Sequence, residues 1–412
     1  MKRVVVTGMA GFSPIGNDWE TIYNHLQNAK TGIVRMDDWD KYDGLNTRLG
    51  APVVDFEMPA HYSRKDLRSM GRVAQFGVLS SERALKDANL LGKDVLLNGE
   101  AGVAYGSSAG DTEAIADFGN MLLNYSCDGL NANSYIKMMA HTSPVNIGIY
   151  FGLKGRVYTT SSACTSASQG IGLAYEAIKH GQQKVMIAGG CERLCASEAA
   201  VFDTLYATSV RNDEPHLTPR PFDKNRDGLV IGEGGGTLIL EELEHALERG
   251  VTIHAELVGF GTNSDGSHIT QPKAETMEKA MRLSIESAQI SPRDIGYISA
   301  HGTATDRGDI AESQATYAVF GRDTPISSFK SFTGHTLGAC GALEAWTAIE
   351  MMKNKWFHAT ANLNDVDEMC GQLDYIMHEG REIDTQYIMS NNFAFGGINT
   401  SLIFKKWERD QG

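Results

Sequence analysis

The stretch CTSASQGIGLAYEAIKHG, residues 164–181, places a reactive residue type ahead of small residues and a helix with an apolar face. The stretch HTLGACGALEAWTAIEMMKN, residues 335–354, has the same order. A second pair of segments, residues 83–113 and 283–312, also agrees, because each predicts a helix, a strand and small residues followed by Gly-Asp and Glu. Such similarity within one chain is typical of duplication. It predicts two related halves that divide near residue 250, with coincidence as the alternative.

The composition is that of a globular protein with a large core. The chain has 412 residues, of which 42% are hydrophobic and 21% charged. Strand-like runs such as KRVVVTG, AGVAYGS and KVMIAGG alternate with helical runs, which indicates an α/β fold. The sequence has no apolar run of about 18 residues, the length of a membrane span. The apolar run in MKRVVVTGMAG is too short for a signal peptide. We therefore expect a cytoplasmic location and no membrane partner.

Charge and cysteine spacing argue against several other classes of protein. The net charge of −14 argues against a nucleic-acid partner. Cys191 and Cys195 have no second cysteine pair or spaced histidine pair nearby, so a reduced protein without a zinc site is expected. DKNRDG (223–228) opens like a calcium loop, but its twelfth position is Gly instead of the required Glu. GEGGGT (232–237) and GMAGFSPIG (8–16) lack the spacing of a dinucleotide loop. The sequence thus predicts neither a metal nor a cofactor.

Cys164 is a candidate nucleophile at the start of a predicted helix. In residues 165–181, Ile171, Tyr175 and Ile178 recur at helical spacing, and the segment ends in Gly. The free N–H groups and the dipole at a helix start stabilise a thiolate. Free cysteines are also among the most buried residues. Taken alone, Cys164 therefore fits a structural role as well as a catalytic one.

Two histidines favour the catalytic interpretation. His301 ends an apolar strand in YISAHGTATDRGD, and His335 begins a helical segment in KSFTGHTLGACGALE, shortly after Lys330. Folds of the α/β type gather such element ends at one crevice, so the histidines are expected to meet Cys164. In NNFAFGGINTSLIF the two glycines form a flexible turn, and Phe395 beside them is placed to cover a cavity.

These motifs resemble those of the β-ketoacyl-acyl carrier protein synthases of the elongating type, similar to synthases I and II of fatty acid synthesis. SSACTSASQGIG resembles the nucleophile motif, AHGTATDRGD and KSFTGHTLGACGALE the histidine motifs, and NFAFGGINTSLIF the Gly-rich gate. The likeness covers essentially the whole chain in order. It implies a thiolase-type fold with α-β-α-β-α layers from two duplicated halves. Residues 1–250 would carry the nucleophilic cysteine, and residues 251–412 the two histidines, the lysine and the gate.

The resemblance also implies a decarboxylating Claisen condensation. Cys164 would take an acyl chain from acyl carrier protein, and malonyl-carrier protein would then lose CO2 to give an enolate. His301 and His335 would stabilise that enolate, while Lys330 would orient the site electrostatically. The products would be 3-oxoacyl-carrier protein, CO2 and free carrier protein. No cofactor is implied, because the substrates are carried on the phosphopantetheine of the carrier protein.

Further residues take roles from the same resemblance. The N–H groups of Cys164 and Phe395 would form the oxyanion hole, and the gate and acyl pocket would be formed by Phe395, Phe393, Ala109 and Phe202. Phosphopantetheine would contact Thr303, Thr305 and Thr270, with structural support from Glu344, Asp309 and Glu312. The carrier protein would dock on Lys65, Arg68 and Arg211. A helix-capping role for Thr305 and a plain core position for Ala109 and Phe202 are equal alternatives. The docking cations fit solvated helix charges equally well.

The chain departs from the usual pattern of the housekeeping enzymes. The loop SCDGLNAN, residues 126–133, lacks a basic pair that the family has before NSYIKMM. Asp306 and Arg307 stand where Pro-Ala or Pro-Val is usual, and Thr336 and Ile398 also differ. These differences favour a specialised synthase, with the aryl polyene pathways of bacteria as one candidate.

The resemblance further implies a dimer, either of two identical chains or with a chain-length-factor-like subunit. A non-catalytic chain-length factor is an alternative function, but such proteins typically replace the nucleophile. A thiolase acting on acyl-CoA typically keeps a second catalytic Cys in its late motif, where this chain has Phe393 and Phe395. A Cys-His hydrolase would need Asn or Asp in place of the second histidine and the lysine.

Overall fold

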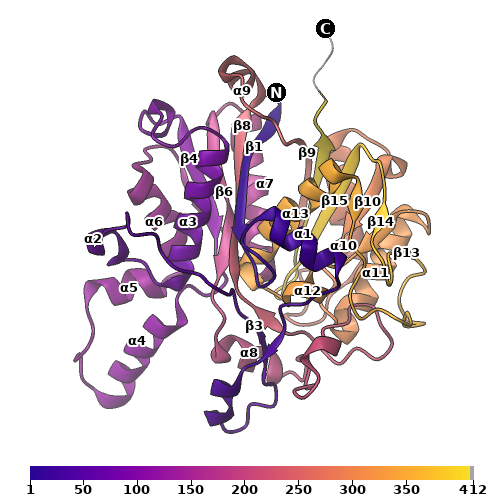
Figure 1. The fold of residues 1–412 in the computed structure, drawn as a ribbon, viewed down its shortest axis with the longest axis horizontal. Coiled ribbons are helices and arrows are strands. Elements are labelled where there is room, and N and C mark those ends of the chain that lie inside the picture. Colours follow the sequence, from indigo (N-terminus) through magenta and orange to yellow (C-terminus); the bar gives the residue numbers. More distant parts are fainter. Residues whose placement is uncertain (409–412) are drawn as a thin grey trace.

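The computed structural model describes residues 1–408. They form one long mixed sheet, with helices on its outer faces and between its two parts (Figure 1). Within the described residues the sheet has 11 strands. The N-terminal part contributes, in spatial order, β5 (Val157–Thr159), β4 (Ala101–Gly106), β6 (Val185–Glu192), β8 (Gly234–Glu242) and β1 (Val4–Phe12). The C-terminal part continues with β9 (Ala255–Ser264), β16 (Ile398–Lys406), β15 (Tyr387–Phe393), β10 (Ile295–Ser299), β11 (Pro325–Ser327) and β13 (Asp374–Tyr375).

The two parts of the sheet repeat one topology. The order β5-β4-β6-β8-β1 matches β11-β10-β15-β16-β9, strand for strand along the chain. In each part the first three strands are parallel and the other two pair antiparallel. The parts join where residues 4–6 of β1 pair antiparallel with residues 255–257 of β9. The predicted thiolase-type fold from duplicated halves is thereby confirmed, while the expected boundary near residue 250 remains a prediction.

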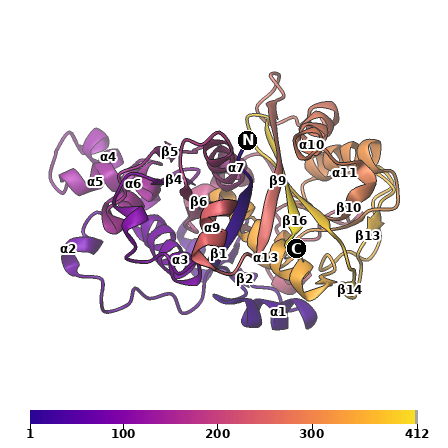
Figure 2. The ribbon, with the colours of Figure 1, turned by 90° about the horizontal axis from the view of Figure 1, so that it is seen from above.

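Helices form three layers around the folded sheet. α3 (Arg72–Asp87) and α6 (Thr142–Phe151) cover the outer face of the N-terminal part, and α10 (Ala274–Ala288) and α11 (Asp306–Phe320) lie against the C-terminal part. α7 (Ser166–Lys179) and α13 (Cys340–Asn354) lie between the two parts, where α7 contacts β6 and β9 and α13 contacts β8 and β15. Figure 2 shows this α-β-α-β-α succession from above.

The remaining elements surround these layers. The helices are α1 (Trp19–Gln27), α2 (Arg64–Leu67), α4 (Thr112–Asn124), α5 (Ala132–Met138), α8 (Ala196–Asp203), α9 (Leu243–Arg249) and α12 (Lys330–Thr333). The short strands are β2 (Val34–Arg35), β3 (Leu49–Ala51), β7 (Ile231–Gly232), β12 (Trp356–Phe357) and β14 (Arg381–Glu382). The 3-10 helices are η1 (Asp37–Lys41), η2 (Asp94–Leu96), η3 (Ala163–Thr165), η4 (Pro215–Leu217), η5 (Pro292–Asp294) and η6 (Leu337–Ala339).

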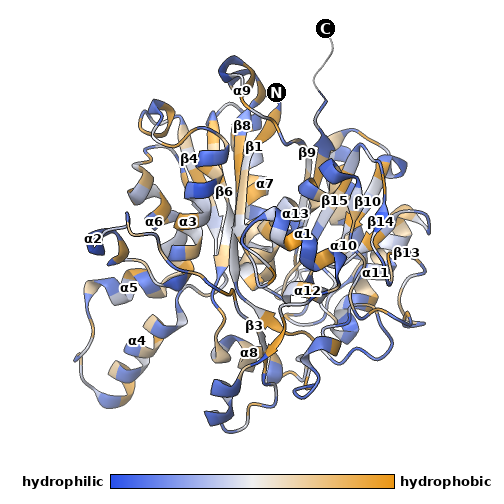
Figure 3. Ribbon diagram, viewed as in Figure 1, coloured by the Kyte–Doolittle hydropathy of each residue, from blue (hydrophilic) through white to orange (hydrophobic). Residues whose placement is uncertain are grey.

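The largest apolar core surrounds the two central helices. β1 is buried along its whole length, as its sequence VVVTGMAGF predicts for a strand covered on both faces. Figure 3 shows the apolar colouring concentrated on β1, β8 and α7. In the part of the chain that the structure describes, no helix combines the length and the apolar character needed to cross a bilayer.

Small residues allow the central helices to lie close to their neighbours. A Cβ on Gly172 of α7 would come within 2.2 Å of the Phe260 ring on β9. A Cβ on Gly341 of α13 would lie 2.8 Å from the backbone nitrogen of Ser168 on α7. Since protein interiors are close-packed, side chains at these two glycines would push the middle layer apart.

We expect Gly172→Ala to destabilise the fold, because the added methyl group overlaps the Phe260 ring. Overpacking of this kind costs about 1–3 kcal/mol in the free energy of unfolding, which a lower apparent melting temperature would report. Gly148→Ala on α6 is the matched control, since nothing lies within 4 Å of a Cβ there. An unchanged melting temperature for Gly172→Ala, with Gly148→Ala also unchanged or higher, would show that the middle layer is not tightly packed.

Candidate active site

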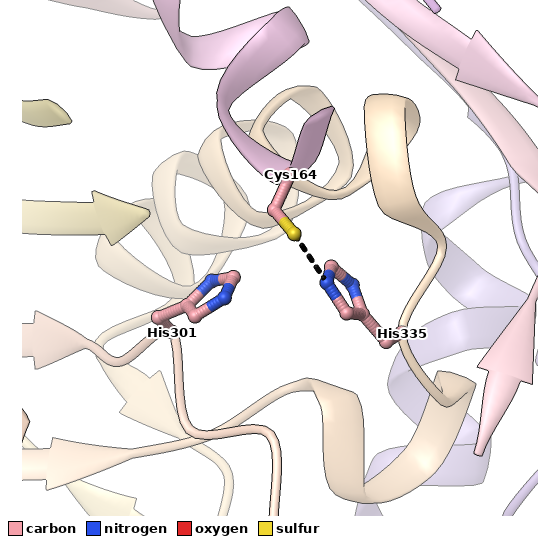
Figure 4. Close-up of side chains that lie close together, drawn as sticks. All are labelled: Cys164, His301 and His335. Carbon is pink, nitrogen blue, oxygen red and sulfur yellow. Dashed lines mark hydrogen bonds between the residues drawn. The ribbon is translucent and has the colours of Figure 1, made fainter. Parts of the chain in front are cut away.

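Cys164, His301 and His335 meet at the ends of three elements, as Figure 4 shows. Cys164 lies in η3, directly before α7, so the predicted helix begins with a 3-10 turn. His301 follows β10, and His335 follows α12. The Nε2 atom of His335 lies 2.9 Å from the Cys164 sulfur, and the two imidazole rings are 5.2 Å apart between centroids. All three side chains are buried, so the structure gathers the residues that the sequence places far apart.

The backbone around Cys164 aims two N–H groups at its sulfur. Ala163, the preceding residue, has a φ of 51°, a left-handed conformation that is costly for a residue with a Cβ. The N–H groups of Phe395 and of Cys164 itself lie near enough to the sulfur to act to lower the pKa of the thiol. These are the two N–H groups that were predicted to form the oxyanion hole. Their convergence on the sulfur suits them to a charge that develops beside it.

Burial dominates the titration of the Cys164 thiol. It raises the pKa of Cys164 to about 11, whereas the Phe395 N–H, the Lys330 ammonium and the Cys164 N–H act to lower it. The stabilisation of a thiolate that was expected from the helix start is therefore outweighed by burial. Desolvation penalises the charged form more strongly than the helix start stabilises it.

Both histidines are neutral at neutral pH and have the same tautomer. Burial and then the nearby Lys330 charge hold the pKa values of His301 and His335 well below the usual range. The Leu337 N–H donates to Nδ1 of His335 over 3.2 Å, which leaves its proton on Nε2, facing Cys164. The Asn392 amide lies 3.5 Å from Nδ1 of His301, which assigns its proton to Nε2 in the same way. The site thus holds two neutral N–H donors.

A buried ion pair accounts for the positive charge near the histidines. Lys330 is 1% exposed and donates to one Glu344 oxygen, while the Asn392 amide donates to the other over 2.6 Å. Burial acts to lower the pKa of Lys330, but its surroundings, Glu344 among them, raise it overall. The lysine therefore stays protonated and disfavours a second positive charge on either imidazole.

Two carboxyl groups hold the loop that carries His301. Glu312 accepts hydrogen bonds from the N–H groups of His301, over 2.7 Å, and Gly302, over 2.6 Å. Asp309 accepts from the Thr303 N–H over 3.0 Å. Burial raises the pKa of Glu312 to about 8 and that of Asp309 to about 6. Two of the three predicted supporting residues, Glu312 and Asp309, therefore act on the backbone rather than on the reacting groups.

A cavity of about 570 Å³ opens onto this cluster. Most of the predicted pocket and arm-binding residues line it: Phe202, Phe393, Phe395, Thr270, Thr303 and Thr305. The rings of Phe202 and Phe395 pack together with centroids 4.9 Å apart. Ala109, a predicted pocket residue, is not among the lining residues, and neither are the predicted docking residues Lys65, Arg68 and Arg211.

Sequence reasoning did not find two residues that the geometry connects to the site. The Asn392 amide contacts both Glu344 and His301. Its position in the NNFAFGG motif could have indicated that it lies near the site. Cys340, at the start of α13, donates from its sulfur to the Cys164 carbonyl over 3.2 Å. Both contacts cross between segments far apart in the chain, which local patterns do not reveal.

The same three side chains could hold a metal ion. The Cys164 sulfur and one ring nitrogen from each of His301 and His335 lie within 4.8 Å of one another. A thiolate with two imidazoles is a set of ligands that zinc accepts.

Comparison with known proteins identifies the family. Models of the "Beta-ketoacyl synthase, N-terminal domain" and of the "Beta-ketoacyl synthase, C-terminal domain" match residues 1–246 and 254–364. A cysteine with two histidines on this duplicated fold thus defines a condensing enzyme of the acyltransferase type. The chain belongs to the β-ketoacyl synthase family.

Individual relatives agree over the full length. The chain is 37% identical to "3-oxoacyl-[acyl-carrier-protein] synthase 2" of Vibrio harveyi, over 98% of this chain and 99% of that protein. The crystal structure of a β-ketoacyl synthase from Burkholderia phymatum superposes with a TM-score of 0.98 and 58% identity, covering 99% of this chain and 100% of the other. The ishigamide ketosynthase/chain length factor structure gives a TM-score of 0.89 at 30% identity, covering 99% and 100%.

The raised pKa of Cys164 predicts slow alkylation of this residue at neutral pH. Because a raised pKa leaves little thiolate below it, the rate of iodoacetamide modification should rise about tenfold per pH unit up to about pH 11. Peptide mass spectrometry would follow Cys164, with the exposed Cys127 in the same digest as internal control for the reagent. A rate for Cys164 that is already constant above pH 8 would contradict the burial argument.

Proposed function

We propose that this chain is a 3-oxoacyl-[acyl-carrier-protein] synthase that condenses malonyl-carrier protein with an acyl chain held on Cys164. The proposal rests on the groups that surround the Cys164 sulfur. The N–H groups of Phe395 and Cys164 and Nε2 of His335 all converge on it, and His301 lies beside it. The name of the Vibrio harveyi relative supports the same reaction.

In the first half-reaction, the sulfur of Cys164 attacks the thioester of an acyl-carrier protein. The small thiolate fraction is stabilised by the Nε2–H of His335 and the two backbone N–H groups. As the tetrahedral intermediate forms, the N–H groups of Cys164 and Phe395 receive its negative oxygen. The carrier leaves as a thiol, with the proton that Cys164 gave up, and the acyl chain stays on the sulfur.

In the second half-reaction, malonyl-carrier protein loses CO2 beside the acylated cysteine. The enolate oxygen accepts from the Nε2–H groups of His301 and His335, which are neutral donors because of burial and the Lys330 charge. A neutral imidazole in a dry site stabilises the enolate without first having to lose a proton. The enolate carbon attacks the acyl thioester, and Cys164 leaves as a thiolate that its N–H donors again stabilise.

The carrier arm would enter through the cavity. Thr270, Thr303 and Thr305 line it with hydroxyl groups, which suit the amides of phosphopantetheine. Thr303 and Thr305 lie 2.9 Å apart between hydroxyl oxygens, so they form one polar surface. Thr305 directly precedes α11, but its side chain makes no capping hydrogen bond there, so the alternative role as a helix cap is not supported.

An acidic carrier protein would need local positive charge on this acidic chain. Lys65 in α2 and Arg68 just after it are exposed and available for that role. Arg211 has its guanidinium 3.6 Å from Asp227, a residue that lines the cavity, so it is placed near the entrance. These three cations are our proposed docking residues.

A second subunit would cover the free edge of the sheet. β5 is the edge strand, and Val157 on it is 50% exposed. Ile149 on the neighbouring α6 is 72% exposed, and further exposed apolar side chains lie on or near α4 and α5: Leu122, Leu123, Tyr125 and Tyr135. An open strand edge with apolar residues around it is a pairing surface. We propose a homodimer, with a chain-length-factor-like subunit as the alternative that the ishigamide structure suggests.

The pathway and location are also proposals. Asp306 and Arg307 line the cavity, so the departure from the housekeeping pattern lies at the substrate entrance. This placement supports a specialised synthase, of which aryl polyene formation is one candidate. We further propose that the enzyme works in the cytoplasm without a metal or other cofactor.

We expect Cys164→Ala to give no 3-oxoacyl product and no acyl-enzyme, because Cys164 is the one cysteine among the described residues that line the cavity. His335→Ala should lower condensation about 10²–10³-fold, the effect of removing one oxyanion donor, and should spare acylation more. Product formation measured by mass spectrometry and acylation measured by intact mass separate the two effects, with the exposed His216→Ala as control. Product from Cys164→Ala would refute the proposed function, and equal loss of both half-reactions in His335→Ala would refute the division of roles.

Removal of metal ions should leave the condensation rate unchanged. We expect elemental analysis of the purified enzyme to show far less than one bound metal per chain, and chelator treatment to have no effect. Added Zn²⁺ should inhibit, because it competes for the Cys164 sulfur and the two imidazoles. Stoichiometric metal whose removal abolishes activity would contradict this account.

A further inference from the structure

A buried carboxyl group near the cavity has no partner. Glu198 lies on α8 and is 6% exposed, yet neither of its carboxyl oxygens has a hydrogen-bond partner among the described residues. By contrast, the buried Glu192 is bound by the Ser107 and Ser108 hydroxyls and by the Ser108 and Gly338 N–H groups. Buried polar groups in folded proteins are normally satisfied, so the group that meets Glu198 is missing from the isolated chain.

Glu198 shares a helix face with Phe202, one of the two rings of the aromatic gate. It precedes Phe202 by four residues, so both side chains lie on one face of α8. Phe202 lines the cavity and packs on Phe395, whose N–H reaches the Cys164 sulfur. Glu198 does not itself line the cavity, so an acyl chain would reach this carboxyl group only by passing the Phe202–Phe395 pair.

Among residues 1–408, the cation that affects Glu198 is already bound elsewhere. The Arg193 guanidinium, which is near enough to affect it, is held by Asp111 over 3.0 Å and by Glu113. Burial, with the charges of Glu192 and Cys195, holds the pKa of Glu198 well above its usual range. The group is therefore a neutral carboxylic acid, which donates one hydrogen bond and accepts others.

The side chains around Glu198 are apolar, so its carboxyl group would discriminate between ligands with and without a hydrogen-bonding group. Ala196, Ala199 and Phe202 of the same helix pack in an apolar cluster with Trp39 and Leu337. A hydrocarbon chain in such a pocket would leave the carboxyl group unpaired, whereas a hydroxyl group would both accept its proton and donate to its carbonyl oxygen.

We propose that Glu198 selects acyl chains that carry a hydroxyl group beyond the gate over plain alkyl chains of the same length. The inference rests on the proposed function, since it concerns the acyl group that Cys164 carries. A site whose buried polar group stays unpaired discriminates strongly against the substrate that lacks the partner. We expect the rate of acylation to differ by about tenfold or more at the best chain length.

The test uses the full chain and pairs of pantetheine thioesters, one alkyl and one ω-hydroxyalkyl, at several chain lengths. Intact mass gives the rate of acylation for each member of a pair. The wild type should favour the hydroxylated member at one or more lengths, and Glu198→Leu should reverse that ratio while it keeps or raises the rate with alkyl chains. Glu198→Gln, which can both donate and accept, should retain part of the preference. Ser197→Ala, on the exposed side of the same helix, should leave the ratio unchanged.

A ratio near one at every length in the wild type would overturn the proposal, and so would a preference that survives Glu198→Leu and Glu198→Gln equally. Either result would be expected if a cation of a second subunit satisfied the carboxyl group. If Glu198→Leu does not fold, the ratio in Glu198→Gln relative to the wild type decides. Failure of the wild type to form any acyl-enzyme with both series would instead refute the proposed function.

Discussion

The packing of α7 against α13 is the constraint on which the site depends. Each helix follows a 3-10 turn whose first residue is left-handed, Ala163 with a φ of 51° and Leu337 with a φ of 45°. The next residue is Cys164 in one half and Gly338 in the other, so the duplication provides only one nucleophile. The Gly338 N–H donates to the Glu192 carboxyl group over 3.1 Å. Glu192 thus lies at the position that corresponds to the nucleophile in the other half. The central packing therefore delivers the cysteine from one half to the histidines of the other.

The buried Lys330 determines much of the electrostatics at the site where the two halves meet. Its charge, balanced by Glu344, lies near enough to lower the pKa of the thiol and of both imidazoles. The effect on the imidazoles adds to burial, and the effect on the thiol opposes it. The site therefore rests with a neutral thiol and neutral N–H donors, and its stabilising groups act mainly when negative charge forms during the reaction.

Local patterns in the sequence predicted an α/β fold with two related halves and the three central side chains, whereas the layered thiolase-type arrangement was implied by the family resemblance. The repeated order of strands and helices predicted the duplication, and Cys164, His301 and His335 stand at element ends. Quantities set by tertiary burial were not predictable in this way. The helix start was expected to stabilise the Cys164 thiolate, but burial outweighs this effect and raises the pKa of the thiol. Glu198 stands among alanines in CASEAAVFD, a pattern typical of a solvated helix residue. The packing around α8 shows that it is buried.

The central claim is that the duplicated fold presents one sulfur, that of Cys164, to both substrates. Peptide mapping by mass spectrometry after incubation with acyl-carrier protein tests it most directly, because the chain has five other cysteines, at positions 127, 191, 195, 340 and 370. The account predicts that the acyl group is found on the peptide carrying Cys164 alone and disappears when malonyl-carrier protein is added, with release of CO2. An acyl group on another cysteine, or one on Cys164 that malonyl-carrier protein does not remove, would contradict it.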